Sequence, residues 1–410
     1  MTTNEVGSRA GTASLRGKPS VTLKVILSVE ALEPQLSGIG RYSWELASRL
    51  GRDMGVDALR FYRNGHWVAD PATLLRPLSM HPLSRTSRWF QRRTRPPQWL
   101  REWWDRPVWR SHIFHGPNYF LPEEGEGGVI TVHDLSIFRY PETHPAERLR
   151  YFERHLAQSI ARASHIITDS EKIRTEVVAD LNVDPARVTK IPLGVSPSYF
   201  PRPDAELATA LDRYGLTPRG YALCVSTVEP RKRIAELLQA WEKLPVAIRR
   251  RWPLMVTGGG GWLSGAVTDR MAKGAREGWV RYLGFVPEQD LSLLYAGASL
   301  FVYPSVYEGF GLPPVEAMAS GVPVVVANAS CLPEITGGAA MLTTPEDVDD
   351  FTYRLEQALT DEAWRSTARQ AGLSVAAGYS WDRCARETAA LYRQVRGEAT
   401  RKPHPACSTN

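Results

Sequence analysis

The feature that most restricts the fold is an alternation of short apolar runs with amphipathic segments along most of the chain. Such runs are typical of strands, and the segments between them carry apolar residues at helical spacing. The alternation predicts an α/β fold, a doubly wound parallel sheet covered by helices. Because 410 residues exceed one ordinary domain, two domains are expected.

The first alternating series predicts a Rossmann-like domain over residues 21–198. After the first strand-like run, Ile39, Tyr42, Leu46 and Leu50 share one helical face. Ser170 is expected to cap a later helix. Strands are expected at 21–29, 128–134, 165–170 and 188–195.

A Pro-rich stretch just after this series predicts a domain boundary, and a second Rossmann-like domain is expected over 199–380. A terminal helix within 381–397 is expected to cross back to the first domain. Residues 1–20 and 398–410 are expected to be disordered tails. Two such domains leave a crevice between their strand ends, where ligands favour binding. Strands of the second domain are expected at 221–227, 253–257, 280–284, 299–303 and 322–327.

Composition favours an ordinary globular enzyme, with 43% hydrophobic and 23% charged residues. No apolar run approaches the roughly 20 residues that span a bilayer, and the polar start contains no signal peptide. A cytoplasmic protein is therefore expected. The four cysteines are far apart, which argues against a zinc site or a disulfide framework.

The basic excess lies entirely in the first half, where residues 1–200 hold 27 Lys and Arg against 21 Asp and Glu. Segment 85–110 alone contains eight Arg and five Trp. This composition suits an anionic membrane surface, and also single-stranded nucleic acid. A solvated loop with its tryptophans packed beneath it is the third interpretation. The balanced second half speaks against nucleic acid, which is not an expected partner.

The stretch "YEGFGLPPVEA" places Glu308 just after a predicted strand and Glu316 in the first turn of a predicted helix. Pro313 and Pro314 suit the start of that helix. The loop before it can offer N–H groups to a phosphate, and a carboxylate can accept hydrogen bonds from a sugar diol. The alternative for Glu316 is simple stabilisation of the helix dipole.

The longer stretch "SVYEGFGLPPVEAMASGVPVVVANASCLPEITGGAA" resembles the signature of family 4 retaining glycosyltransferases, which have the two-domain GT-B fold. The resemblance extends over about residues 22–395. It implies that Glu316 binds the ribose of a nucleotide-sugar donor and Glu308 the hydroxyls of the transferred sugar. The N–H groups of Phe310, Gly311 and Leu312 would then hold the donor's sugar and diphosphate.

Two cations, Arg231 and Lys232, follow another predicted strand, where they could neutralise a leaving diphosphate. The family has Lys at the position of Lys232. Many members also have Arg six residues earlier, where this chain has Ser226. Arg231 is therefore the expected substitute, and a solvated pair of cations is the alternative.

Three further stretches match the family's pattern. The loop "SGIGRYSWEL" contains Gly38 and Gly40 but lacks the third glycine of a dinucleotide fingerprint. The resemblance implies that this loop faces the donor and that Arg41 points into the cleft. It also implies that His133, in "HDLSIFRYPE", contacts the donor sugar or diphosphate, and that Val286 contacts the base.

A possible metal motif, "DVD" at 347–349, precedes a helical pattern, so its acids are expected to cap that helix. No metal and no cofactor are therefore predicted. The donor is a substrate.

The resulting prediction is a retaining hexosyltransferase, with GDP-mannose as the expected donor and a glycan or polyprenyl-linked acceptor. The enzyme is expected at the inner face of the cell membrane, in polysaccharide or O-antigen synthesis. A UDP-sugar donor and a non-catalytic binding scaffold are the alternatives.

Overall fold

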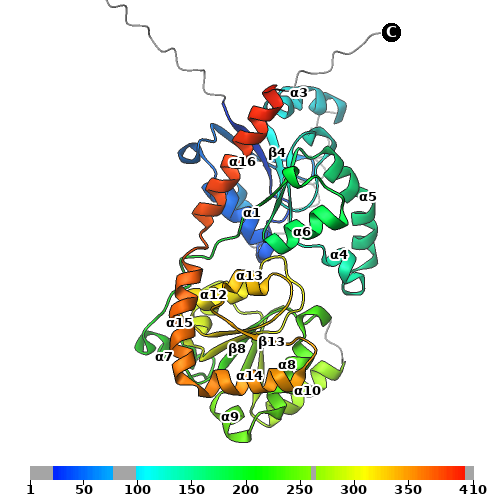
Figure 1. Cartoon of the computed structure of the whole chain (residues 1–410). Coiled ribbons are helices and arrows are strands. Elements are labelled where there is room, and N and C mark those ends of the chain that lie inside the picture. The colour runs from blue at the N-terminus through cyan, green and yellow to red at the C-terminus, as the bar shows by residue number, and fades with distance from the viewer. Residues whose placement is uncertain (1–21, 77–97, 260–264, 402–410) are drawn as a thin grey trace, which may run out of the picture.

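The computed structural model describes residues 22–76, 98–259 and 265–401. Within these ranges the strands form one sheet of seven strands and one of six. We call the part built on the first sheet the N-terminal domain and the part built on the second the C-terminal domain. The two domains are stacked end to end (Figure 1). The predicted α/β class is confirmed.

The N-terminal sheet has the order β3-β2-β1-β4-β5-β6-β7, and only β3 runs antiparallel to its neighbour. The prediction omits β2, β3 and β4. The first two form a half-buried edge with Arg and His among their apolar residues, so they lack a continuous apolar run. The strands are β1 (Lys24–Ser28), β2 (Ala58–Arg63), β3 (His66–Val68), β4 (Ile113–Gly116), β5 (Val129–Val132), β6 (His165–Thr168) and β7 (Val188–Lys190).

The C-terminal sheet is fully parallel among its described strands, with the order β10-β9-β8-β11-β12-β13. Its strands β9, β11 and β12 are completely buried, as their Val- and Leu-rich sequences predict. The short edge strand β13 is an addition to the predicted set. The strands are β8 (Ala222–Val225), β9 (Leu254–Thr257), β10 (Val280–Gly284), β11 (Leu300–Tyr303), β12 (Val324–Ala327) and β13 (Met341–Thr343).

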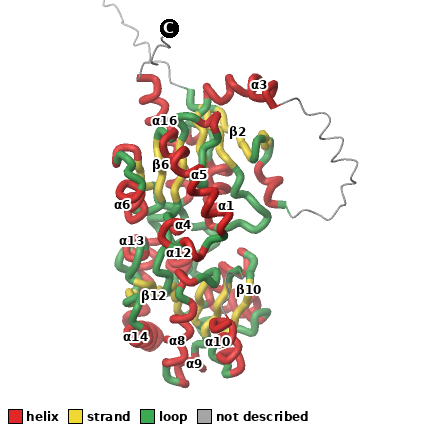
Figure 2. The backbone as a smooth tube through the Cα atoms, turned by 90° about the vertical axis from the view of Figure 1, so that its right-hand side faces the viewer, coloured by secondary structure: helices red, strands yellow, loops and turns green. Residues whose placement is uncertain are grey.

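Helices cover both sheets, and Figure 2 shows them outside the strands of each domain. In the N-terminal domain they are α1 (Gly38–Arg49), α3 (Gln98–Ser111), α4 (Ser136–Arg139), α5 (Ala146–Arg162) and α6 (Glu171–Asp180). In the C-terminal domain they are α7 (Asp204–Asp212), α8 (Ile234–Lys243), α9 (Val246–Arg251), α10 (Gly265–Arg276), α11 (Glu288–Gly297), α12 (Leu312–Ala319), α13 (Leu332–Thr336), α14 (Val348–Thr360) and α15 (Glu362–Ala376). Short 3₁₀ turns occur at η1 (Arg52–Met54), η2 (Pro71–Leu75), η3 (Glu123–Gly125), η4 (Pro141–Thr143), η5 (Pro185–Arg187) and η6 (Pro230–Lys232).

The last helix, α16 (Trp381–Arg401), leaves the C-terminal domain and lies against α1 (Figure 1). Arg49 of α1 binds Asp382 at 2.7 Å, and the buried Tyr392 hydroxyl lies 2.6 Å from Nδ1 of His115. This helix therefore ties the two domains together by a second connection, separate from the chain between β7 and α7.

Two predicted helix caps are confirmed. The Ser170 hydroxyl accepts a hydrogen bond from the N–H of Ile173 at the start of α6. Asp347 accepts hydrogen bonds from the N–H groups of Asp349 and Asp350 at the start of α14. The "DVD" acids thus begin a helix on the surface.

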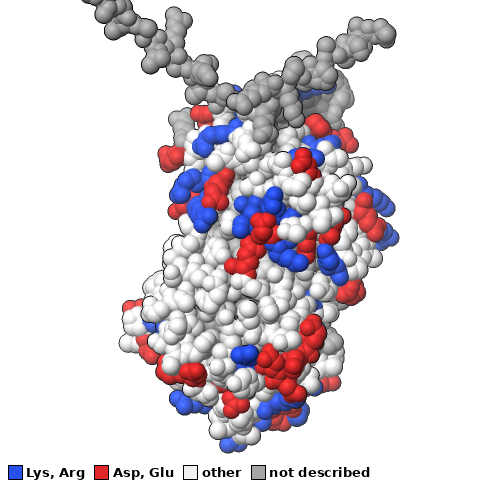
Figure 3. Space-filling view, in the orientation of Figure 1, with Lys and Arg blue, Asp and Glu red and all other residues white. Residues whose placement is uncertain are grey.

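Charged side chains of both signs are interspersed on the face seen in Figure 3, and an uncharged surface covers much of the junction between the domains. No single-sign field dominates the part of that face formed by described residues.

Candidate active site

A cavity of about 710 Å³ lies between the two domains. It is lined at the carboxyl ends of parallel strands from both sheets, the place where open α/β sheets bind ligands. His133 follows β5, Asp169 follows β6, Ser226 follows β8 and Gly258 follows β9. The predicted crevice is therefore present, and it is large enough for a nucleotide-sized ligand.

The loop before α12 forms one wall of this cavity. Gly311 has a φ of +96°, a left-handed conformation that favours glycine, and it is the N-cap residue of α12. Glu316 is the fifth helical residue, so the prediction that it lies in the first turn is wrong. The helix begins directly after the Gly311 turn, with Leu312, and both prolines fit inside its first turn. Phe310, Gly311 and Leu312 all line the cavity.

Glu308 is buried at the cavity wall, in contact with Lys232. Its Oε1 accepts a hydrogen bond from the Tyr303 hydroxyl at 2.7 Å, and Lys232 Nζ donates to the same hydroxyl at 3.2 Å. Burial alone would raise the pKa of Glu308, but Lys232 and Arg231 outweigh it and hold the pKa below its ordinary value. Glu308 is therefore an ionised carboxylate fixed beside a buried ammonium.

Arg231 lies behind Glu308 and is not among the residues that line the cavity. Its guanidinium donates to the backbone oxygen of Tyr307 at 2.9 Å and pairs with Glu229 at 3.1 Å. Its Nη1 also lies 3.6 Å from Glu308 Oε2. The structure thus places Arg231 as a support for Glu308, while Lys232 reaches the cavity itself.

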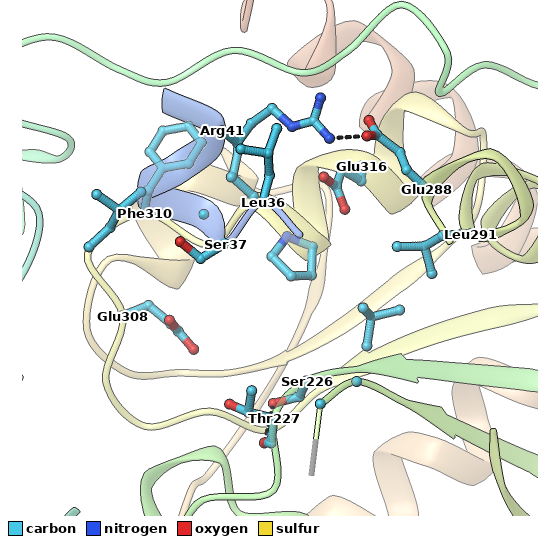
Figure 4. Close-up of a pocket in the computed structure, with 18 of the residues that line it drawn as sticks. Leu36, Ser37, Arg41, Ser226, Thr227, Glu288, Leu291, Glu308, Phe310 and Glu316 are labelled. Atoms are coloured by element: carbon cyan, nitrogen blue, oxygen red, sulfur yellow. Dashed lines mark hydrogen bonds and ion pairs between the residues drawn. The ribbon is translucent and has the colours of Figure 1, made fainter. Parts of the chain in front are cut away.

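Glu316 also lines the cavity, from the opposite side of the loop (Figure 4). Burial raises the pKa of its carboxyl to about 7, against the lowering effects of Tyr295, Arg41 and Tyr199. The hydroxyl of the buried Tyr295 lowers the pKa of this carboxyl, yet it has no hydrogen-bond partner. The carboxyl of Glu316 therefore retains hydrogen-bonding capacity for a ligand.

Arg41 extends from α1 across the cavity and pairs with Glu288 of α11, so it connects the two domains (Figure 4). Its Nη1 lies 3.7 Å from Glu45 on its own helix. The prediction that Arg41 points into the cleft is confirmed.

The two glycines before Arg41 differ in placement. Gly38 lines the cavity at the start of α1, whereas Gly40 does not. A side chain on Gly40 would lie 2.8 Å from the backbone oxygen of Ala31. Gly40 is therefore required for local packing at the start of α1, where Ser37 caps the helix by accepting a hydrogen bond from the Gly40 N–H at 3.1 Å.

His133 lines the cavity, but both of its ring nitrogens contact other protein groups. Nδ1 lies 2.6 Å from Oδ2 of the buried Asp169, and Nε2 lies 2.8 Å from the backbone oxygen of Pro117. Burial would lower the pKa of His133, but Asp169 and the Pro117 oxygen raise it above its ordinary value. A protonated ring that donates from both nitrogens fits these two acceptors.

The backbone of His133 contacts the C-terminal domain directly. A side chain on Gly309 would lie 1.8 Å from the His133 backbone oxygen, so only glycine allows this approach. The Ser170 hydroxyl donates to the Gly309 oxygen at 2.7 Å. Since Gly309 follows Glu308, this contact fixes the loop of one domain against the strand end of the other.

Val286 is 6% exposed and lines the cavity beside Phe285, which is 57% exposed. The prediction omits Asp169, Tyr303 and Glu288. Asp169 lies at the end of the predicted strand 165–170 and could have been found by that position. Tyr303 and Glu288 carry no such signal, because a strand tyrosine and a helix-start glutamate are common structural residues.

The described residues contain no group of three or more His, Cys, Asp or Glu side chains that could hold a metal ion. Among the same residues, no helix combines the length and apolar character that crossing a bilayer requires.

Segment 85–110 lies partly outside the described residues, which resume at 98 with α3. Trp109 of α3 stacks on Phe114 at a ring distance of 5.5 Å and contacts Tyr62 at 5.1 Å. This one tryptophan therefore packs against the sheet, as the structural interpretation of the segment expects. The membrane interpretation of the remaining residues stays a prediction.

Two facing α/β domains with a carboxylate- and cation-lined cavity between their strand ends define a GT-B glycosyltransferase architecture. Solved structures agree on this fold. WaaG, described as a glycosyltransferase involved in lipopolysaccharide biosynthesis, has a TM-score of 0.66 at 17% identity over 90% of this chain and 99% of its own. Sucrose-phosphate synthase from Thermosynechococcus elongatus has a TM-score of 0.65 at 20% identity over 92% of this chain and 100% of its own.

Sequence comparison identifies the family. Residues 215–374 match the family described as "Glycosyl transferases group 1", and residues 36–199 match "Glycosyltransferase Family 4". The chain is 40% identical to "O-antigen chain mannosyltransferase B" of Escherichia coli, over 90% of this chain and all of that one. It is 30% identical to "Serotype-specific mannosyltransferase WbdA" of Escherichia coli, over 62% of this chain and 32% of that protein. The chain belongs to the family 4 glycosyltransferases, and the predicted enzyme class is confirmed.

Proposed function

We propose that this glycosyltransferase moves mannose from GDP-mannose to a hydroxyl of a lipid-linked or growing glycan in O-antigen synthesis, with retention at the anomeric carbon. The proposed transfer reaction is supported by one observation, the Lys232–Glu308 pair in the wall of the interdomain cavity. The mannosyl part is supported by the relative named "O-antigen chain mannosyltransferase B", which is 40% identical over its whole length.

Lys232 is the group proposed to hold the leaving diphosphate. Its ammonium lies in the cavity at a helix start, and it is held there by Glu308 and Tyr303. Charge on a departing diphosphate grows in the transition state, so a fixed cation stabilises the transition state more than the bound donor. The N–H groups of Gly311 and Leu312 at the N-terminus of α12 can share that charge, whereas Pro313 and Pro314 have no N–H to donate.

Glu308 is proposed to bind hydroxyls of the transferred sugar, and Glu316 the ribose diol. Glu308 already contacts Lys232, Arg231 and Tyr303, so it is poorly suited to act as a free nucleophile. This arrangement supports the proposal of a front-face reaction. The bond from the anomeric carbon to the diphosphate oxygen breaks, the acceptor oxygen bonds to the same face, and the diphosphate takes the acceptor proton.

A donor screen tests this proposal. Purified enzyme is incubated with GDP-mannose, other GDP-hexoses and UDP-hexoses, and release of free nucleoside diphosphate is measured with and without a mannan-type acceptor. Fastest release from GDP-mannose is expected. Preference for a UDP-sugar would overturn the donor assignment but not the class, whereas binding of donors without turnover would indicate a scaffold. Neighbours solved with UDP and glucose are only 18% identical, so they bear on the fold alone.

Catalysis is proposed to need no metal ion. Lys232 and the N-terminus of α12 both line the cavity, and together they can neutralise the diphosphate without a metal ion. Full turnover in excess chelator is expected. A loss of turnover that returns on adding a divalent ion would contradict this part.

Attachment to the inner face of the cell membrane through segment 85–110 is proposed on the charge of that segment. Its eight Arg and five Trp suit an anionic surface. Binding to phosphatidylglycerol vesicles should be salt-sensitive and should disappear when the arginines of 85–95 are replaced by Gln. Unchanged vesicle binding in that variant would exclude the segment.

A further inference from the structure

A second hollow, of about 600 Å³, lies in the C-terminal domain away from the active site. Gly220 and Ser299, which line it, lie just before the starts of β8 and β11. Ser226 and Tyr303, at the other ends of these strands, line the active-site cavity. The two sites are therefore on opposite edges of one sheet. In Figure 1, α9 marks this end of the molecule, far from the N-terminal domain.

Four arginines converge on this hollow from three elements. Arg251 ends α9, Arg365 and Arg369 are one turn apart on α15, and Arg219 precedes β8. The acids that line it are Asp204 and Glu362, whose side chains are 59% and 73% exposed. Asp204 pairs with Arg219 at 3.2 Å and Glu362 with Arg365 at 3.5 Å. Four arginines therefore face two largely exposed acids at the hollow.

Arg365 is the buried member of the group, with 8% of its surface exposed. Its Nη1 and Nη2 donate to backbone oxygens of Leu359 and Ser299 at 3.3 and 3.4 Å, and its buried Nε has no hydrogen-bond partner. Burial lowers the pKa of Arg365, and Arg369, Arg251 and Arg219 add to that lowering against the effect of Glu362. Arg365 therefore has one acid partner, the largely exposed Glu362 at 3.5 Å, against three neighbouring arginines.

The buried ring of Trp252 lines the hollow and contacts two of the arginines. The guanidinium of Arg251 lies 4.3 Å from its ring centroid and that of Arg365 lies 6.0 Å from it. Stacking on a buried ring reduces the number of conformations open to an arginine before a ligand binds. Arg219 and Arg369 are held similarly, by the backbone oxygens of Ala296 and Gly321 at 2.6 and 3.1 Å.

We propose that this arginine hollow is a binding site for a phosphate group, separate from the active site. Planar guanidinium groups that approach from several sides match the several oxygens of a phosphomonoester, which the flexible ammonium of Lys does less well. The source of the group is a free phosphorylated small molecule or a phospholipid headgroup. Both present the same chemistry to Arg251 and Arg365.

Calorimetric titration of inorganic phosphate into the full chain, at constant ionic strength kept with chloride, tests the site. Saturable binding is expected in the wild type and in Lys232→Ala, whose active-site cavity lacks its main cation. Arg251→Gln should weaken that binding roughly tenfold, the equivalent of one charge-assisted hydrogen bond. Arg250→Gln is the matched control, because Arg250 is an exposed residue of the same helix that does not line the hollow.

A second arm uses vesicles of phosphatidylcholine with and without phosphatidic acid. Binding to phosphatidic acid that falls in Arg251→Gln but not in Arg250→Gln, with no binding of free phosphate, identifies a headgroup as the source. Phosphate binding with the same variant pattern identifies a free anion. If neither probe binds in a manner that depends on Arg251, the proposal is wrong. Arg251 is exposed, so its replacement is not expected to prevent folding.

Discussion

Glu334 of the C-terminal domain caps a helix of the N-terminal domain: its carboxylate accepts hydrogen bonds from the N–H of Glu171 at 2.9 and 3.0 Å. It also accepts from the N–H of Lys172 at 3.2 Å and pairs with Lys190 at 3.3 Å. The capped helix, α6, begins just after Asp169 and Ser170. One carboxylate therefore sets the position of the His133 partner relative to the Glu308 loop.

Replacing Glu334 by Ala should lower kcat/KM about tenfold, because the cap that aligns the two domains is lost. The cost in unfolding free energy should be about 1 kcal/mol, the usual value of a helix cap. Steady-state kinetics and urea unfolding measure the two effects. Glu346→Ala, an exposed acid of the same domain, is the control. Equal kinetics in both variants would show that the cap has no catalytic consequence.

Lys232→Ala should reduce kcat by about a hundred- to a thousandfold, the effect of removing one preorganised group that stabilises transition-state charge. Lys243→Ala, an exposed lysine of α8, should leave kcat unchanged. Thermal unfolding of both variants checks that they fold. Arg231 would still neutralise part of Glu308 in the Lys232 variant, so folding should survive. A near-normal kcat would defeat the assigned role.

Donor binding by the Glu316 carboxyl should depend on pH near neutrality, because burial raises the pKa of this group from 4.5 to about 7. Only the ionised form accepts two hydrogen bonds from a diol, so donor affinity should rise about tenfold between pH 6 and pH 8. Donor titrations across this range measure it. Glu316→Gln should bind more weakly and show a flat profile in the same range. A parallel slope in that variant would assign the pH dependence to another group.

The same raised pKa affects stability with a defined sign. The folded protein holds the Glu316 proton more tightly than the unfolded chain, so this contribution is complete below pH 4.5 and is lost as pH rises through 7. The expected loss is about 3 kcal/mol. It is measured as the difference in unfolding free energy between the wild type and Glu316→Gln at each pH. A difference that does not change between pH 4.5 and 8 would contradict it.

Asp169→Asn should destabilise the ligand-free protein by about 3 kcal/mol, because it removes the buried carboxylate that lies 2.6 Å from His133 Nδ1. The pKa of His133 should fall at the same time, since Asp169 is what raises it against burial. Urea unfolding measures the first effect, and NMR titration of the ring measures the second. An unchanged His133 pKa would mean that the Pro117 oxygen alone sets it.

Local patterns predicted the features that depend on neighbouring residues. Buried strands such as β9 and β11 are short apolar runs, and Ser170 and Asp347 cap helices through groups two or three residues away. The edge strands β2 and β3 were beyond this reasoning, because their partial exposure mixes polar and apolar residues. The turn of α12 that holds Glu316 was also misplaced, since a helix boundary depends on a single left-handed residue, Gly311.

The sequence by itself determined the α/β class, the family and the residues at the strand ends, because those follow from periodicity and from one continuous motif. Tertiary structure decided which of those residues face the ligand. Arg231 and Lys232 are adjacent in the chain, yet one supports Glu308 from behind and the other lines the cavity. The pairs His133–Asp169 and Arg41–Glu288 join residues far apart in sequence, since packing of separate strands and domains, and not chain spacing, sets those distances.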